Sequence, residues 1–267
     1  MSAEAATAPA AQRPRSDVRL SLKELAALSS RLLRARGMPV GALGTGVRLV
    51  ELVELCDQGA GIALLERLAH DDSRLSTEVA VLAEQPHVGV CGGGGSTALL
   101  CGPPAVDWAA ALASKHSPGL VLIRDVVDVE LACALAVFGA SRATTVVVAA
   151  APAAAHRAWC AYAGADGGAI VEELVPEPWI AEHGAPLLNA HAPSPRTPWL
   201  LIGSGQEAER PAAHAVAGVR GVRELGPLRQ RAYAHGVHVN VDTWHELTAC
   251  ADRILVPTSP TSRLGAG

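Results

Sequence analysis

Aromatic side chains are scarce in this sequence. Phe, Trp and Tyr together make up 3% of the 267 residues, whereas 49% of the residues are hydrophobic. The core must therefore consist mainly of Ala, Val and Leu, a composition that favours helices packed against a mostly buried sheet. A chain of this length can bury a substantial core, as one large domain or two small ones.

An excess of positive charge and long apolar runs are missing too. The net charge is −4, so no basic field is available to hold a nucleic acid backbone. No apolar run reaches the roughly 18 to 20 residues that span a bilayer. The first residues do not combine a basic segment with an apolar one, so we expect no secretory signal there. We therefore expect a cytoplasmic protein that binds neither nucleic acid nor membrane.

Paired cysteines and metal-binding motifs are also absent. The six cysteines are scattered and form no CxxC pair, so we expect reduced, partly buried thiols rather than disulfides. The ten histidines include no HExxH motif and no Cys/His spacing typical of zinc. We therefore expect no bound metal.

What is present suggests one α/β domain behind a polar arm. Residues 1–17 are rich in Ala, Pro and polar residues, which predicts a disordered arm. We expect residues 18–267 to form a single α/β domain. Its expected parts are a helical segment at 18–70, a β-α-β core at 85–152, an irregular α/β part at 153–255 and a C-terminal loop at 256–267.

Local patterns support this division. Ser21 and Glu24 have the spacing of a capping box before leucines at helical spacing. In the middle of the chain, apolar runs at 88–90, 119–123 and 145–149 predict strands. Between them we expect helices, with residues 102–104 (Gly-Pro-Pro) breaking the first one and Ser96 or Asp107 as possible caps. The resulting β-α-β-α-β order predicts a sheet with helices packed against it. Further strands are expected at 170–171, 199–202 and 238–241, with a loop at 176–198 and a helix capped by Asp242.

A run of four glycines follows the strand predicted at 88–90. The backbone of Gly93, Gly94 and Gly95 and the hydroxyl of Ser96 could approach a cofactor phosphate. The run matches neither the GxGxxG fingerprint nor a Walker loop. Three interpretations therefore stay open: a flexible turn, a loop that faces a ligand, or a nucleophile at Cys91.

Arg124, Asp125 and Asp128 follow the apolar run at 119–123. Ligands of open α/β sheets collect at the carboxyl ends of strands. Arg124 can hold a carboxylate through two parallel hydrogen bonds, with Asp125 beside it, and Asp128 can act as an acid or base. The alternative is a helix cap with an ion pair between Arg124 and one of the two aspartates.

The C-terminal segment from 257 to 263 combines hydroxyl groups with one fixed cation. Ser262 and Arg263 could close over an anionic ligand or dock on a partner subunit, although such tails are often simply mobile. The ending from Ser262 to Gly267 resembles a group of uncharacterised bacterial proteins.

Taken together, these stretches resemble the family of sulfolactate, malate, ureidoglycolate and piperideine-carboxylate dehydrogenases and reductases. Residues 20–25 resemble its opening helix, residues 107–152 its central part, and residues 235–247 its closing Trp-x-Glu-Leu helix. The resemblance implies a non-Rossmann α/β fold with a helical N-terminal layer packed on a mixed sheet. It also implies NAD(P)H as cofactor, a small carboxylate substrate (a 2-oxo acid or cyclic imino acid) and a homodimer.

Two departures from the family pattern concern catalysis. Residues 58–61 (Gln-Gly-Ala-Gly) stand in place of Asp-Ser-His-Gly, and Asp128 stands where the family has the histidine of Arg-Asn-Ser-x-His. We therefore expect NAD(P)H binding to be weak or lost. The favoured hypothesis is an enzyme in which Arg124 binds the carboxylate while Asp128 and His116 are catalytic, by reduction or by cofactor-free proton-transfer or lyase chemistry. The alternative is a non-catalytic binding or assembly partner that keeps the fold.

Overall fold

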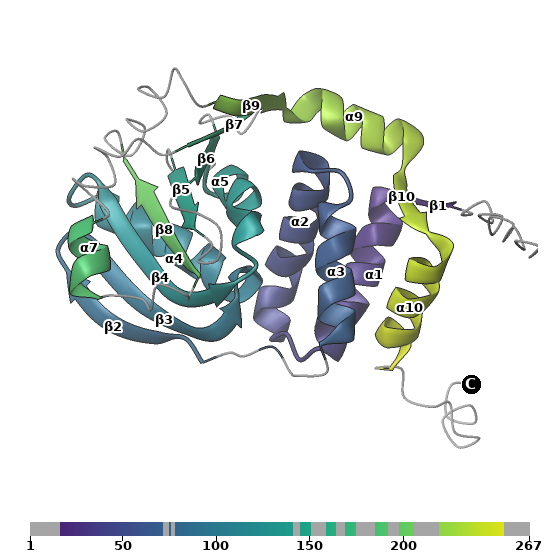
Figure 1. Cartoon of the computed structure of the whole chain (residues 1–267), viewed down its shortest axis with the longest axis horizontal. Coiled ribbons are helices and arrows are strands. Elements are labelled where there is room, and N and C mark those ends of the chain that lie inside the picture. Colours follow the sequence, from purple (N-terminus) through teal and green to yellow (C-terminus); the bar gives the residue numbers. More distant parts are fainter. Residues whose placement is uncertain are drawn as a thin grey trace, which may run out of the picture.

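The computed structural model describes residues 17–71, 75, 78–140, 145–150, 159–163, 169–174, 185–191, 198–205 and 219–253. The predicted arm therefore lies outside the described residues up to residue 16, and so do Ser262 and Arg263. Figure 1 shows a large sheet, two helices against it and a further layer of helices beyond them. The expected α/β fold, with a helical N-terminal layer and a mixed sheet, is confirmed.

The helical layer gathers both ends of the described chain. It consists of α1 (Leu22–Ala35), α2 (Val40–Cys56), α3 (Ala60–His70) and α10 (Val241–Asp252). The capping box is present, because Ser21 Oγ accepts a hydrogen bond from the Glu24 amide at 3.2 Å and Glu24 Oε2 accepts one from the Ser21 amide at 2.7 Å. A short antiparallel pair, β1 (Asp17–Leu20) with β10 (Val237–Asn240), joins the N-terminal segment to the C-terminal one. The segment expected to be helical from residue 18 therefore begins with a strand.

The main sheet has eight strands in the order β2-β3-β4-β8-β5-β6-β7-β9. Only β3 and β4 pair in parallel, and the other neighbours are antiparallel. β8 lies between β4 and β5, so the predicted β-α-β core is completed by a strand from far along the chain. The strands are β2 (Ala80–Gln85), β3 (Val88–Thr97), β4 (Gly119–Val127), β5 (Thr145–Ala150), β6 (Trp159–Ala163), β7 (Ala169–Leu174), β8 (Trp199–Ser204) and β9 (Val219–Glu224).

Two apolar helices, α4 (Ala98–Ala113) and α5 (Ala132–Ala140), lie between the sheet and the helical layer. A single turn of 3₁₀ helix, η1 (Val129–Leu131), precedes α5. Every residue of α5 is buried, as expected for a helix covered on both sides. One buried apolar cluster runs through the helical layer, these two helices and the sheet.

The predicted break at residues 102–104 is wrong, because α4 continues through Pro103 and Pro104. A proline in a helix interior costs about 3 kcal/mol, but Pro103 is buried and Gly102 packs against α5, where an added Cβ would lie 2.6 Å from Leu135. Burial of Pro103 and the packing of α4 between the sheet and α5 thus outweigh the local preference. Its cap is Thr97, whose side chain accepts a hydrogen bond from the Leu99 amide, rather than Ser96 or Asp107.

The last part of the described chain is more helical than expected. α7 (Ala185–Ala190) lies within residues 176–198, which we predicted to be a loop, and α9 (Leu225–His235) runs from β9 to β10 across the molecule (Figure 1). The cap of α10 is Asn240, whose side chain accepts a hydrogen bond from the Asp242 amide. The prediction that Asp242 caps this helix is therefore wrong. Within the described part of the chain, no helix has the length and apolar character needed to span a membrane.

Candidate functional site

The predicted site residues Arg124 and Asp125 lie within β4 and not after it. The apolar run was expected to end at Ile123, but β4 pairs with β3 as far as Val127. The strand continues because its neighbour β3 supplies partners again after a local irregularity. Asp125 adopts a left-handed backbone conformation with φ of 54°, which is uncommon for residues other than glycine.

The glycine run forms that irregularity in β3. The pairing register with β4 shifts between Gly92 and Ser96, and Gly94 and Gly95 have φ of 53° and 76°. A Cβ added at Gly93 would lie 2.7 Å from the backbone oxygen of Asp125. The glycines are therefore required by a bulge and by the close approach of two strands. The short strand and following turn expected here are wrong, since β3 runs from Val88 to Thr97.

Arg124 opens onto a cavity at this bulge, which we call the Arg124 cavity. Its volume is about 530 Å³. The Nε of Arg124 is buried and has no hydrogen-bond partner in the part of the chain that the structure describes. No hydrogen bond from Nε to a described residue therefore competes with a ligand for this side chain. The lining residues are Glu78, Val79, Ala80, Leu82, Gly92, Gly94, Arg124 and Asp125.

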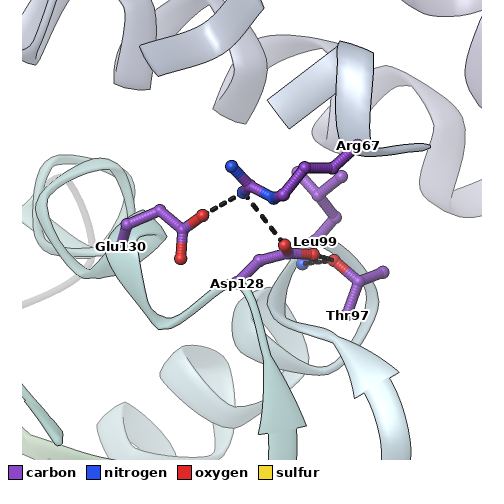
Figure 2. Close-up of polar contacts among 5 residues, drawn as sticks. All are labelled: Arg67, Thr97, Leu99, Asp128 and Glu130. Carbon is purple, nitrogen blue, oxygen red and sulfur yellow. Dashed lines mark hydrogen bonds and ion pairs between the residues drawn. The ribbon is translucent and has the colours of Figure 1, made fainter. Parts of the chain in front are cut away.

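Asp128 belongs to a second group of polar residues, at the carboxyl ends of β3 and β4. Figure 2 shows its carboxylate between Thr97 and Arg67. Thr97 Oγ1 donates a hydrogen bond to Asp128 Oδ2 at 2.6 Å, and an Arg67 guanidinium nitrogen lies 3.1 Å from Asp128 Oδ1. The same nitrogen donates to Glu130. We call these four residues the Asp128 cluster.

The Asp128 cluster ties the helical layer to the sheet. Arg67 lies on α3, Thr97 ends β3 and caps α4, and Asp128 follows β4 with φ of 61°. Only 10% of the Asp128 side chain is exposed, compared with 49% of the Arg67 side chain. The ion pair of Asp128 is therefore with Arg67, and the predicted pairing of Asp128 with Arg124 is wrong. Asp128 does not line the Arg124 cavity.

The segment that replaces the Asp-Ser-His-Gly motif of the resembled family is used for helix capping. The carboxylate of Glu54 on α2 accepts hydrogen bonds from the amides of Gly59 at 2.8 Å, Gly61 at 3.0 Å and Ile62 at 3.2 Å. Burial raises the pKa of the Glu54 carboxyl above its ordinary value, and these bonds oppose the rise. Residues 58–61 thus start α3 and join it to α2.

His116 lies far from the other predicted site residues. It is exposed in the loop before β4, while Arg124 and Asp125 lie in the second half of that strand. At about 3.3 Å per residue, the two ends of β4 are roughly 26 Å apart. The structure therefore brings Arg124 and Asp125 together in one cavity but leaves His116 at the other end of the strand.

The cysteine nucleophile considered from the sequence is not supported. Burial raises the pKa of Cys91 to about 11 and that of Cys101 to about 12. A nucleophilic cysteine reacts as the thiolate, which needs a lowered pKa. Both side chains thus act as buried apolar groups at neutral pH.

The described residues suit a dinucleotide poorly. The Arg124 cavity is lined by one cation and two carboxylates, whereas a pyrophosphate brings two negative charges of its own. Phosphates are usually bound at a helix N-terminus, but at the start of α4 the side chain of Thr97 already caps the helix and bonds Asp128. Ser96 is buried. No group of three or more His, Cys, Asp or Glu side chains in the described segments is placed to hold a metal ion.

No protein-family model and no curated protein matches this chain. Solved structures do match over nearly the whole length. The malate dehydrogenase from Pyrococcus horikoshii has a TM-score of 0.62 at 12% identity, over 90% of this chain and 97% of that one. A dehydrogenase from Sinorhizobium meliloti has a TM-score of 0.63 at 15% identity, over 88% of this chain and 100% of that one.

A sulfolactate dehydrogenase from Methanocaldococcus jannaschii matches with a TM-score of 0.58 at 12% identity, over 88% of this chain and 97% of that one. The expected sulfolactate and malate dehydrogenase-like fold is therefore confirmed. At these identities the similarity shows the fold alone, so the function must be argued from the residues of this chain.

Proposed function

We propose that this dehydrogenase-like fold binds a small carboxylate that also carries a cationic nitrogen, such as an amino acid or a protonated cyclic imino acid, in the Arg124 cavity. The observation that carries the proposal is that Arg124 lines that cavity and that its Nε has no hydrogen-bond partner among the described residues. A guanidinium group fits a planar carboxylate because two parallel N–H···O bonds fix its orientation.

The other charges of the Arg124 cavity narrow the class of ligand. Among the described residues, Glu78 and Asp125 line it together with Arg124, and these three side chains sum to a negative charge when both carboxylates are ionised. A 2-oxo acid carries negative charge only, and the two carboxylates disfavour it. A zwitterion places its carboxylate against Arg124 and its cationic nitrogen near Asp125 or Glu78. Charge complementarity of this kind selects between ligands of similar size.

We further propose that the protein is an enzyme that moves a proton at the carbon adjacent to the iminium carbon of a bound, protonated cyclic imino acid. When that proton leaves, the C–H electron pair forms the C=C bond of a neutral enamine and the electron pair of the C=N bond moves onto the nitrogen. Asp125 shares the cavity with Arg124 and can take up and return the proton. Asp128, predicted from the sequence to have this role, remains the alternative group. Because the described residues suit a dinucleotide poorly, the proposed reaction uses no nicotinamide.

The experiment combines binding with proton exchange. Thermal-shift and calorimetric titrations would compare amino acids, cyclic imino acids and 2-oxo acids, together with NADH and NADPH, since a ligand that binds the folded state raises its stability. ¹H NMR in D₂O would then follow the exchange of carbon-bound protons in any ligand that binds. We expect a zwitterionic ligand to bind and to exchange, and exchange to be lost in D125N if Asp125 is the proton acceptor.

A matched pair of variants locates the binding. R124K keeps the positive charge but loses the two parallel N–H donors of the guanidinium group. R34K makes the same change at an exposed position of α1. We expect R124K to weaken binding by about 1.5–3 kcal/mol and R34K to have no effect. Equal affinities for the two variants would contradict the proposal, as would a preference for 2-oxo acids over zwitterions.

A further inference from the structure

A second cavity lies at the opposite end of β4, and we call it the histidine cavity. Its volume is about 580 Å³. Three segments that are distant in the sequence each contribute one imidazole: His87 from the turn between β2 and β3, His116 from the loop between α4 and β4, and His191 directly after α7. The other lining residues are Gln85, Val88, Ser117, Pro118, Leu120, Pro186, Leu187 and Ala190.

The charges of this cavity differ from those of the Arg124 cavity. Among the described residues that line it there is no Asp or Glu, and the ionisable side chains of this described lining are the three histidines. Two charged chain neighbours, Lys115 beside His116 and Glu84 beside Gln85, are exposed and do not line it. The described lining thus offers hydrogen-bond donors from imidazole, amide and hydroxyl groups.

The walls of the histidine cavity are held in place by the fold. The backbone oxygen of His87 accepts a hydrogen bond from the Leu120 amide at 2.9 Å, which joins the β2–β3 turn to the start of β4. Gly119 is packed tightly on α4, since an added Cβ would lie 2.2 Å from the backbone oxygen of Ala109. Val88, Leu120 and Leu187 are buried and give the cavity an apolar floor. A preformed cavity of mixed polarity is typical of a small-molecule site.

We infer that the histidine cavity binds a sulfate or phosphate ester. Its anionic group would accept hydrogen bonds from the imidazoles, the Gln85 amide and the Ser117 hydroxyl, and its organic part would lie on the apolar floor. The described segments hold no group of three His, Cys, Asp or Glu side chains placed for a metal ion, and we therefore propose an anion. An acidic ligand matches a cavity whose lining, as far as the structure describes it, contains no carboxylate. This site is independent of the proposed carboxylate site, which lies toward the other end of β4.

The test uses probes whose charge does not change with pH. Sodium sulfate and phenyl sulfate would be titrated into the protein at about pH 6 and about pH 8, with ionic strength held constant, because a cationic donor forms a stronger hydrogen bond to an anion than a neutral one. The ¹⁵N and ¹H resonances of labelled histidine side chains locate the site. We expect shifts at His87, His116 and His191 and none at His238 or His245. Phenyl sulfate should bind more tightly than sulfate, and both about tenfold more tightly at the lower pH.

Variants separate this site from general charge effects. H87Q and H116Q keep a side chain that can form hydrogen bonds but cannot become cationic, and H238Q makes the same change at an exposed position of β10. We expect the first two to weaken phenyl sulfate binding about tenfold, while H238Q and R124K leave it unchanged, with thermal unfolding confirming that each variant is folded. Shifts spread over all histidines, equal affinity at both pH values, or H87Q behaving like H238Q would overturn the inference. Equal affinities for sulfate and phenyl sulfate would show that the organic part adds nothing to binding, and would contradict the proposal that the ligand is an ester.

Discussion

Two arginines, Arg67 beside the carboxyl end of β4 and Arg124 within that strand, have opposite surroundings. Arg67 contacts two carboxylates, Asp128 and Glu130, although about half of its side chain is exposed. Arg124 is more enclosed, yet its Nε has no partner among the described residues. Arg67 is thus held in an ionic network that ties α3 to the sheet, whereas no described residue accepts a hydrogen bond from the Nε of Arg124, which lines a cavity. From this comparison we propose a binding role for Arg124 and a structural role for the Asp128 cluster.

The largest effect that would test this comparison is expected from D128A. The change removes the acceptor of the Thr97 hydroxyl and of the Arg67 guanidinium, and it places alanine at a left-handed backbone position. We expect the free energy of unfolding to fall by about 3 kcal/mol, as measured by urea denaturation. The free energy of unfolding should fall less in D128N than in D128A, since asparagine tolerates the left-handed backbone conformation.

The outcome for Asp128 also tests its predicted catalytic role. If Asp128 handles the proton, D128N should abolish exchange while ligand binding remains. If it is only a structural tie, as its contacts favour, exchange and binding should both persist in D128N. Loss of proton exchange in D128N but not in D125N would show that Asp128 is the proton acceptor, and would contradict a purely structural role for the Asp128 cluster.

The next largest effect is expected at the glycine bulge that supports the Arg124 cavity. G93A places a methyl group against the backbone of Asp125, which cannot move as a flexible side chain could. We expect a loss of about 2 kcal/mol in stability, together with weaker ligand binding. G41A is the control, because an added Cβ at this helical position meets nothing within 4 Å. It should leave stability unchanged or raise it by up to about 1 kcal/mol.

A smaller effect is expected when nicotinamide cofactors are added, because we expect them to bind only weakly. The cavity offers one cation beside two carboxylates, and Thr97 already caps the start of α4. We therefore expect NADH and NADPH to bind with dissociation constants above about 10 μM, or less than about 7 kcal/mol of binding free energy. Fluorescence titration of NADH is a direct measurement. Tighter binding would show that residues beyond the described ones complete a cofactor site.

The part of the fold that depends on neighbours in sequence could be predicted. Ser21 and Glu24 form the expected capping box, and the apolar run at 119–123 is a buried strand. Burial against distant elements decided the rest. α4 passes through two prolines because both of its sides are covered, and β8 enters the sheet from about 70 residues further along the chain.

The candidate site, like the fold, could be predicted only where the signal is local in the sequence. Arg124 and Asp125 stand out locally because a charged pair ends an apolar run. Arg67 gave no such signal, since an arginine on an amphipathic helix is ordinary, and its partner Asp128 is 61 residues away. Thr97 was missed because the sequence offered Ser96 as an equally suitable cap beside it. Long-range ion pairs and the choice between adjacent caps are set by packing and not by local pattern.

The most direct measurement compares R124K with R67K in two assays, calorimetric titration with the best zwitterionic ligand and urea denaturation. We predict that R124K loses at least about tenfold in affinity with a stability change within about 0.5 kcal/mol. R67K should lose about 1 kcal/mol of stability and keep its affinity. Unchanged affinity in R124K, with a loss of stability as large as that in R67K, would contradict the account and make both arginines structural.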